Sequence, residues 1–597
     1  MPKSTAARPR KTKETLPTWN LSDLYAGPKD AGLEADVAWC KERSDAFQIR
    51  YKGKLAGLSG AEMGAAIAEF ERIVERRYKL GSYSQLLHAA NVSDPAVGQF
   101  YQTLTERMTD IGTATLFFTL ELNRLDDAVV EKQLADPAAG KYASWVKEVR
   151  LYRPHQLSDE LEQFIHDRAP VDGSWSRLFD ETLAGMRFPI GGKKLTLSDV
   201  MNRMSDKSRA KRKAAAKALG KGLNERIGLF SLITNTLAKE KELDDRWRKY
   251  AGPVSYRNLS NRVEDEVVEA LSNSVRGAYP ELSHRYYKLK AKWLGVKKLD
   301  YWDRNAPLPK APEREYTWKD ARKTVLNAYG AFAPEMADVA DRFFEGRWID
   351  APPRAGKSSG AFSHSTVPSV HPYILMNFHG KARDVMTLAH ELGHGVHQVL
   401  AGPQGVLMAD TPLTLAETAS VFGEMLTFQA MLKAEDRPAM RRALLAGKVE
   451  DMLNTVVRQI AFFEFEKRVH TERRQGELSQ SRIGDIWMDV QKESLGPALR
   501  FDDDYRPFWA YIPHFIHSPF YVYAYAFGDC LVNSLYAVFQ NGHPGFQAKY
   551  LKMLQAGGTL RHKELLAPFG LDAGDPGFWK KGLSVVAGFI DELERMR

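Results

Sequence analysis

The segment at residues 387–397 constrains this chain more than any other, because it holds two histidines one helical turn apart. His390 and His394 flank Glu391 in an H-E-x-x-H arrangement. Residues four apart lie on one face of an α-helix, so both imidazoles can reach one cation while Glu391 addresses a water on it. Zinc accepts imidazole nitrogen, and a catalytic zinc site keeps three protein ligands and one open position. The segment therefore predicts a zinc site on a helix.

The residues around this motif predict a buried amphipathic helix. Apolar side chains recur at three- and four-residue spacing between Val385 and Val396. A third histidine in the pattern H-E-x-x-H-x-x-G-x-x-H is excluded, because that pattern needs glycine at 397 and histidine at 400, where the chain has His397 and Leu400. The third ligand must therefore be a carboxylate from another segment.

A second helical segment, residues 414–426, offers such carboxylates. Glu417, Ser420 and Glu424 lie along one face of a segment that is otherwise apolar. Burying two carboxylates without partners is costly, and a metal and a metal-bound histidine are suitable partners. We predict Glu417 as the third metal ligand and Glu424 as the acceptor for the ring N–H of a ligating histidine.

These motifs together resemble the thimet oligopeptidase superfamily of zinc endopeptidases, and within it the oligoendopeptidase F branch. Other stretches match the same branch over nearly the whole chain: residues 19–25, 356–363, 372–378, 514–515 and 521–525. Two positions depart from the branch's usual residues: Phe362 stands where tyrosine is frequent, and Ser358 where arginine is common. These departures concern subsite preference and leave the chemistry intact.

The resemblance implies a mainly α, two-lobed, zincin-like fold with a small β-sheet beside the active-site helix and a deep central cleft. It also implies a zinc-dependent endopeptidase that hydrolyses internal bonds of short unfolded peptides, with Zn²⁺ as cofactor. Glu391 would act as general base, taking a proton from the water and passing it to the leaving amine.

The resemblance further implies that a histidine and tyrosines from residues 511–528 stabilise the oxyanion. We predict His514 and Tyr523 as catalytic donors, and Tyr521 and His517 as substrate contacts. On a regular helix Tyr521 would share a face with Tyr525 while Tyr523 points away, so the choice of Tyr523 assumes a partly unwound segment.

The chain of 597 residues has 44% hydrophobic and 27% charged residues, which is enough apolar material for a large core. No apolar run reaches the eighteen residues of a membrane span, and the first residues lack the apolar core of a secretory signal. Cys40 and Cys530 form no disulfide framework. These features predict a soluble cytoplasmic protein without a membrane partner.

The formal net charge is +9, and part of the excess lies in residues 1–13, which contain no acidic residue. We predict a disordered basic tail at residues 1–18. A transit peptide or a nucleic-acid-binding arm is the more specific alternative to a disordered tail, but the segment is short and not amphipathic. Elsewhere acidic and basic residues are interspersed, so no nucleic-acid partner is predicted.

Helical periodicity dominates residues 32–350, with long segments at 61–77, 97–125, 210–251 and 263–294. Pro280 predicts a kink or break in the last of these. Gly191 and Gly192 predict a small hairpin at residues 188–197. A boundary near residue 198 would separate an N-terminal helical lobe, residues 19–198, from the zinc peptidase domain, residues 199–597.

Strand signals concentrate in residues 352–378, just before the predicted zinc helix. An exposed strand edge beside the metal would pair with an extended peptide through backbone hydrogen bonds, which permits broad specificity. A purely structural sheet under the helix fits the sequence equally well.

Three other functions fit parts of the sequence. A metallocarboxypeptidase of related helical fold needs a basic group that binds a free C-terminal carboxylate, and no residue can be assigned to it. A peptide-binding protein that keeps only the scaffold has no use for Glu391 as a general base. A nucleic-acid binder would depend on the basic tail and would show salt-sensitive binding.

Overall fold

The structure is a computed structural model that describes residues 14–309 and 314–596. It is mainly helical, with a few short strands in three small sheets, so the predicted fold class is confirmed. No helix in the described ranges is both long enough and apolar enough to span a membrane. Residues 1–13 of the predicted basic tail lie outside the described residues.

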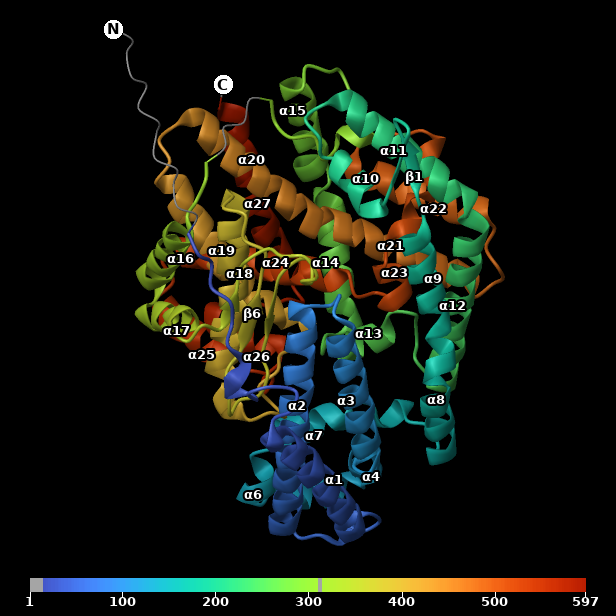
Figure 1. Cartoon of the computed structure of the whole chain (residues 1–597), viewed down its shortest axis with the longest axis vertical. Helices are drawn as coiled ribbons and strands as arrows, with labels where there is room; N and C mark the ends of the chain where they lie inside the picture. The colour runs from blue at the N-terminus through green and yellow to red at the C-terminus, as the bar shows by residue number, and fades with distance from the viewer. Residues whose placement is uncertain (1–13, 310–313, 597) are drawn as a thin grey trace.

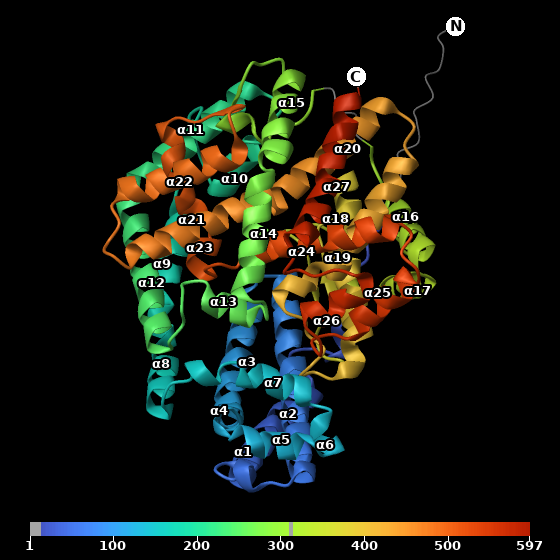
Figure 2. The same ribbon diagram turned by 180° about the vertical axis from the view of Figure 1, so that it is seen from behind.

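The first seven helices project from the rest of the molecule at one end (Figures 1 and 2). Six of them, all except α3, share a separate hydrophobic core built around Phe47, Phe70 and Phe118, whereas the buried side chains of α3 belong to the main core. Their bounds are α1 Ala31–Tyr51, α2 Gly60–Ala90, α3 Pro95–Thr113, α4 Leu116–Arg124, α5 Asp127–Leu134, α6 Pro137–Gly140 and α7 Ala143–Arg150. The single helix predicted at residues 97–125 is thus two helices, separated by a turn at residues 114–115.

The next eight helices occupy the middle of the chain: α8 Asp159–Asp172, α9 Ser174–Gly185, α10 Leu197–Arg203, α11 Arg209–Glu225, α12 Ile227–Trp247, α13 Ser255–Ser260, α14 Asp265–Ala278 and α15 Arg285–Trp293. A break at Arg226 divides the helix predicted at 210–251. The break predicted at Pro280 is present: α14 ends at Ala278, and a π-helical turn, Pro280–His284, leads into α15.

The remaining helices build the part of the molecule that carries the H-E-x-x-H motif: α16 Trp318–Phe332, α17 Pro334–Glu345, α18 Ala382–Ala401, α19 Leu413–Lys433, α20 Pro438–Thr455, α21 Val457–Arg473, α22 Gln480–Leu495, α23 His514–His517, α24 Tyr523–Gln540, α25 Phe546–Gln555, α26 His562–Leu566 and α27 Pro576–Arg595. Helices α18, α19, α24 and α27 pack in succession through the interior (Figure 1). The predicted zinc helix is α18, and its flank from Val385 to Val396 is buried.

The three sheets are short. Strands β1 Phe188–Ile190 and β2 Lys193–Leu195 form the predicted antiparallel hairpin, with Gly191 and Gly192 at positive φ in its turn. Strands β3 Leu299–Asp300 and β7 Leu499–Arg500 pair in parallel. The third sheet has the order β4–β6–β5, with β4 Ile349–Asp350, β5 Phe362–His364 and β6 Tyr373–Leu375. β5 is an edge strand of this sheet and packs against α18.

Part of the predicted tail makes defined contacts. The Glu14 carboxylate accepts hydrogen bonds from the backbone N–H groups of Trp318 and Lys319 at the start of α16. The Pro17 carbonyl accepts one from the N–H of Ala351 beside β4. Glu14 and Pro17, which the prediction placed in a disordered tail, are therefore held by the rest of the chain, whereas the boundary near residue 198 stays a prediction.

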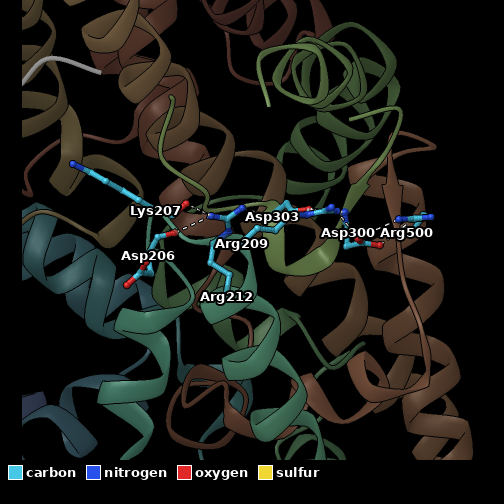
Figure 3. Close-up of polar contacts among 7 residues, drawn as sticks. All are labelled: Asp206, Lys207, Arg209, Arg212, Asp300, Asp303 and Arg500. Atoms are coloured by element: carbon cyan, nitrogen blue, oxygen red, sulfur yellow. Dashed lines mark hydrogen bonds and ion pairs between the residues drawn. The ribbon is translucent and has the colours of Figure 1, made fainter. Parts of the chain in front are cut away.

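A charge network joins α11 to the β3–β7 pair (Figure 3). The carboxylate of Asp303, 1% exposed, accepts hydrogen bonds from Arg212 at 2.8 Å and Arg209 at 2.9 Å. Arg209 also donates to Asp300, which receives a further bond from Arg500. Two guanidinium groups thus converge on one buried carboxylate, and charges that are buried in this way depend on each other.

We expect Asp303→Ala to lower the free energy of unfolding by about 3–5 kcal/mol, because it leaves the Arg212 guanidinium buried without a counter-charge. Arg500→Ala is the matched control, since the Arg500 side chain is 60% exposed and such a pair contributes at most about 1 kcal/mol. Denaturant unfolding of both variants measures the difference. Equal losses in the two variants would show that the network does not depend on Asp303.

Candidate metal centre

The helix α18 presents His390 and His394 on the side that faces α19. Asp384 fixes the start of α18 by accepting hydrogen bonds from the N–H groups of His379 and Lys381. The two helices approach closely at Gly393, where a Cβ atom would lie 2.4 Å from the carbonyl oxygen of Ala419. Only glycine fits at this contact, so the glycine inside the motif brings α19 within reach of the two histidines.

The structure brings the three predicted ligands together. The Nε2 atom of His390 lies 3.3 Å from Oε2 of Glu417, and the Nε2 atom of His394 lies 3.6 Å from the same oxygen. One ligand atom from each of the three residues lies within 4.8 Å of those of the other two. Ser420 donates a 2.6 Å hydrogen bond to this carboxylate and helps to orient it.

These spacings fit a tetrahedral cation. Ligand atoms about 2.0–2.1 Å from a tetrahedral metal lie about 3.3–3.4 Å apart, close to the two distances from Glu417. Two imidazoles and one carboxylate also form the donor set of a catalytic zinc site that keeps a fourth position open. The three residues therefore fit a divalent metal in both geometry and chemistry.

Glu424 lies behind His390, as predicted. Its Oε2 is 3.2 Å from Nδ1 of His390, while its other oxygen accepts a 2.7 Å hydrogen bond from Nζ of Lys448. Burial opposes the charged carboxylate, but Lys448 and His390 outweigh it and lower the pKa of Glu424 to about 2. Glu424 is therefore an anion at neutral pH. An anionic acceptor at Nδ1 fixes the ring orientation and leaves Nε2 for the metal.

Lys448 was not predicted as part of the site. Its side chain is 6% exposed and donates to Glu424 from α20. The sequence does carry a signal for it, because Lys448 shares the 3-and-4 spacing of the buried residues Leu445, Val449 and Met452. A lysine on an apolar stripe needs a buried counter-charge, and this one contacts the anion behind the metal ligand.

Glu391 lies on the flank of α18, buried beside the ligands. Burial raises the pKa of its carboxyl to about 7, while the charge of His390 and a backbone hydrogen bond from Ser363 act in the other direction. A bound dication also favours the carboxylate. A carboxyl group poised near neutral pH suits a proton carrier.

A cavity of about 720 Å³ opens beside these residues. His390, Glu391, Glu417 and Glu424 line it, together with Lys448 and Tyr525. The residues that precede β5, Gly360 and Ala361, form part of its wall. Two of the three metal ligands, the proposed base and the residues just before the edge strand therefore line one space.

The predicted oxyanion tyrosine lies outside this cavity. Tyr523 is fully buried, and its hydroxyl accepts a 2.9 Å hydrogen bond from the Asn261 side chain. Tyr525 lines the cavity instead, with its ring 5.2 Å from that of Tyr521. Helix α24 begins at Tyr523, so Tyr521 lies just outside it. The Tyr521 ring still contacts that of Tyr525, whereas the Tyr523 hydroxyl contacts Asn261.

The two predicted histidines occupy different places. The Nε2 atom of His514 lies 3.5 Å from the hydroxyl of Tyr525, which places it beside the metal cavity. Burial, followed by the charge of Arg458, lowers the pKa of His514. His517 turns the other way and pairs with Asp180 of α9 at 2.9 Å, with a side chain that is 39% exposed.

The fold and this centre together define a helical metallopeptidase. The chain matches the model of peptidase family M3 over residues 202–585 and the oligopeptidase F model over residues 121–188. The chain belongs to peptidase family M3. It is a metalloendopeptidase of the oligopeptidase type, which confirms the predicted resemblance and enzyme class.

Curated relatives align over almost the whole chain. Oligopeptidase PepF of Bacillus subtilis is 27% identical over 97% of this chain and 87% of that protein. An oligoendopeptidase F homologue of Lactococcus lactis is 26% identical over 97% of both chains. The solved oligoendopeptidase F of Enterococcus faecium has the same fold, with a TM-score of 0.72 at 21% identity over 95% of this chain and 97% of that one.

We expect Glu424→Ala to weaken metal affinity by roughly ten- to a hundredfold, because His390 loses the anion that orients it. Lys448→Met should shift affinity in the same direction by less, since Glu424 stays in place. Competition of each variant with a chromophoric chelator measures the affinity. An unchanged affinity in Glu424→Ala would remove Glu424 from the metal centre.

Proposed function

We propose that the metal is Zn²⁺ and that the enzyme hydrolyses internal bonds of short unfolded peptides. One observation carries the proposal: two imidazole nitrogens and the Glu417 oxygen converge at ligand spacing, with Glu391 facing the same cavity. Nitrogen and oxygen donors at tetrahedral spacing favour zinc among the common divalent metals. The names of the relatives, oligopeptidase and oligoendopeptidase, support short peptides as substrates.

Zinc in this site supplies a Lewis acid that polarises the scissile carbonyl and lowers the pKa of water. Glu391 accepts the proton of the attacking water and delivers it to the nitrogen of the leaving amine. His390, held by Glu424, and His394 stay neutral as ligands, so neither competes for this proton. Burial of the Glu391 carboxyl keeps bulk water away from the transfer.

The oxyanion donor proposed here is Tyr525, with His514 beside it. The Tyr525 hydroxyl lies within 3.5 Å of His514 and in the wall of the metal cavity. A donor aimed at developing charge in a buried cavity stabilises the transition state more than the substrate. Tyr521, whose ring contacts that of Tyr525, is proposed to contact the substrate.

The peptide backbone is proposed to pair at the start of β5. Gly360 and Ala361 line the metal cavity there. Two residues further along, the Ser363 carbonyl accepts a hydrogen bond from Gln398 of α18, and the Ser363 N–H is directed to Glu391. The edge of β5 is thus occupied at Ser363, which limits strand-like pairing to the residues before it.

The cytoplasm remains the proposed location. Cys40 and Cys530 are buried free thiols, which suits a reducing compartment. The absence of nucleic-acid and membrane partners stays a prediction from the sequence.

The proposed function predicts that a strong zinc chelator abolishes peptide cleavage and that added Zn²⁺ restores it. Glu391→Gln should lose nearly all turnover while keeping its metal, because it preserves the shape but removes the proton acceptor. Mass spectrometry of a peptide library detects the cleavage sites, and elemental analysis gives the metal content. Cleavage without metal, or only terminal trimming, would contradict the proposal.

The donor assignment predicts that Tyr525→Phe lowers kcat by roughly a hundred- to a thousandfold with little change in KM. Tyr523→Phe is the matched control two residues away, since its hydroxyl contacts Asn261 outside the cavity. Steady-state kinetics on one peptide compares the two variants. A large loss in Tyr523→Phe alone would restore the original choice of Tyr523.

A further inference from the structure

Arg458 lies in the wall of the metal cavity and has no role in the chemistry above. It stands in the first turn of α21 and lines the same space as His390 and Glu391. Its charge also reaches the ring of His514, whose Nε2 lies 3.5 Å from the hydroxyl of Tyr525 in the same cavity wall. A permanent cation is therefore placed where a bound peptide would pass.

The Arg458 guanidinium has no protein counter-charge within the described part of the chain. No hydrogen bond or ion pair from another described residue reaches it, and its Nε is a buried donor without a partner. The guanidinium packs over the ring of Phe462, whose centroid is 4.8 Å from its central carbon. Burial lowers the pKa of Arg458, which shows that the surroundings disfavour the charge.

Two other buried cations show how this chain usually compensates such a charge. Arg212 has the carboxylate of Asp303 at 2.8 Å, and Lys448 has that of Glu424 at 2.7 Å. Arginine cannot escape the cost by losing its proton, because a guanidinium stays protonated in proteins. The Arg458 guanidinium, which lines a cavity and has no such partner among the described residues, is therefore a candidate binding group for an anion.

The neighbouring residue supports this interpretation independently. Gln459 lines the same cavity, and its Oε1 is buried without a hydrogen bond from any described residue. Buried polar atoms in native proteins nearly always have partners, so two adjacent unsatisfied side chains on one wall point to a ligand. The two missing partners differ: the Arg458 guanidinium lacks an acceptor and suits a planar anion, whereas the Gln459 Oε1 lacks a donor, such as a peptide backbone N–H.

We infer that Arg458 binds a carboxylate of the peptide substrate, with the Gln459 Oε1 accepting a hydrogen bond from an N–H of the same peptide, and so selects peptides that carry a carboxylate near the scissile bond. This inference rests on the proposed function and adds a substrate class to it. A peptide has two sources of such a group: its C-terminus and the side chains of aspartate and glutamate. If the C-terminus is the source, the distance from Arg458 to the metal limits how far from the end the enzyme cuts.

The test uses the zinc-loaded full-length enzyme and matched peptides. One pair differs only in a free or amidated C-terminus, and further pairs carry glutamate or glutamine at single positions around the cleaved bond. The wild type should prefer the carboxylate member of at least one pair by about 10- to 100-fold in kcat/KM, the range of a charge-assisted hydrogen bond. The pair that shows this ratio identifies the source of the carboxylate.

Arg458→Met should reduce that ratio to within about twofold, and Arg458→Lys should keep part of it, because lysine supplies charge without the planar fork. Arg383→Met is the matched control, since Arg383 is an exposed cation in the same cavity wall, and its ratio should stay as in the wild type. Circular dichroism and metal content establish that each variant is folded and loaded.

Two results would overturn the inference: equal cleavage of every pair by the wild type, or an undiminished ratio in Arg458→Met. If Arg458→Met proves unfolded, the wild-type ratio and Arg458→Lys still decide, because a ratio unchanged by lysine removes the requirement for guanidinium. Failure of the zinc-loaded wild type to cleave any peptide would instead contradict the proposed function.

Discussion

The metal centre depends on the close contact between α18 and α19. Gly393 lets the α19 backbone approach to a distance that any side chain would prevent. Glu417 can then bring its oxygen to 3.3 Å and 3.6 Å from the two histidine nitrogens. Helix α24 closes on the other side, where a Cβ at Gly528 would lie 2.7 Å from that of Glu417. Close packing on both sides of α19 leaves the carboxylate little freedom.

Buried charge is the second constraint, and around the metal ligands each buried charge has a partner of opposite sign. Lys448 neutralises Glu424, and Glu424 orients His390. These contacts run from Lys448 on α20 through Glu424 on α19 to His390 on α18, so three helices contribute to one electrostatic network. Such a unit is stable only if every member is present, because removing one leaves a charge in a low-dielectric interior. The Asp303 network solves the same problem with two arginines.

The sequence predicted the parts of the site that follow from local periodicity. His390, His394 and Glu391 follow from helical spacing, and Glu417 and Glu424 follow from two carboxylates on an apolar stripe. Contacts between segments that are distant in the sequence could not be predicted from it. Lys448 reaches Glu424 from another helix, and Arg458 becomes notable only once its surroundings are known. Regular helical spacing would have indicated Tyr525, which shares a face with Tyr521, but the choice of Tyr523 assumed an unwound segment. The helix breaks at Arg226 and at residues 114–115 carry no proline signal, and the nearby Gly228 and Gly112 lie inside the helices themselves.

Anomalous X-ray diffraction at the zinc absorption edge, on crystals of the active enzyme, tests the central claim most directly. The account predicts one strong peak in contact with Nε2 of His390, Nε2 of His394 and a carboxylate oxygen of Glu417, with Glu424 on the far side of the His390 ring. A peak at another place in active crystals, or full activity in crystals without a peak at any metal edge, would contradict it.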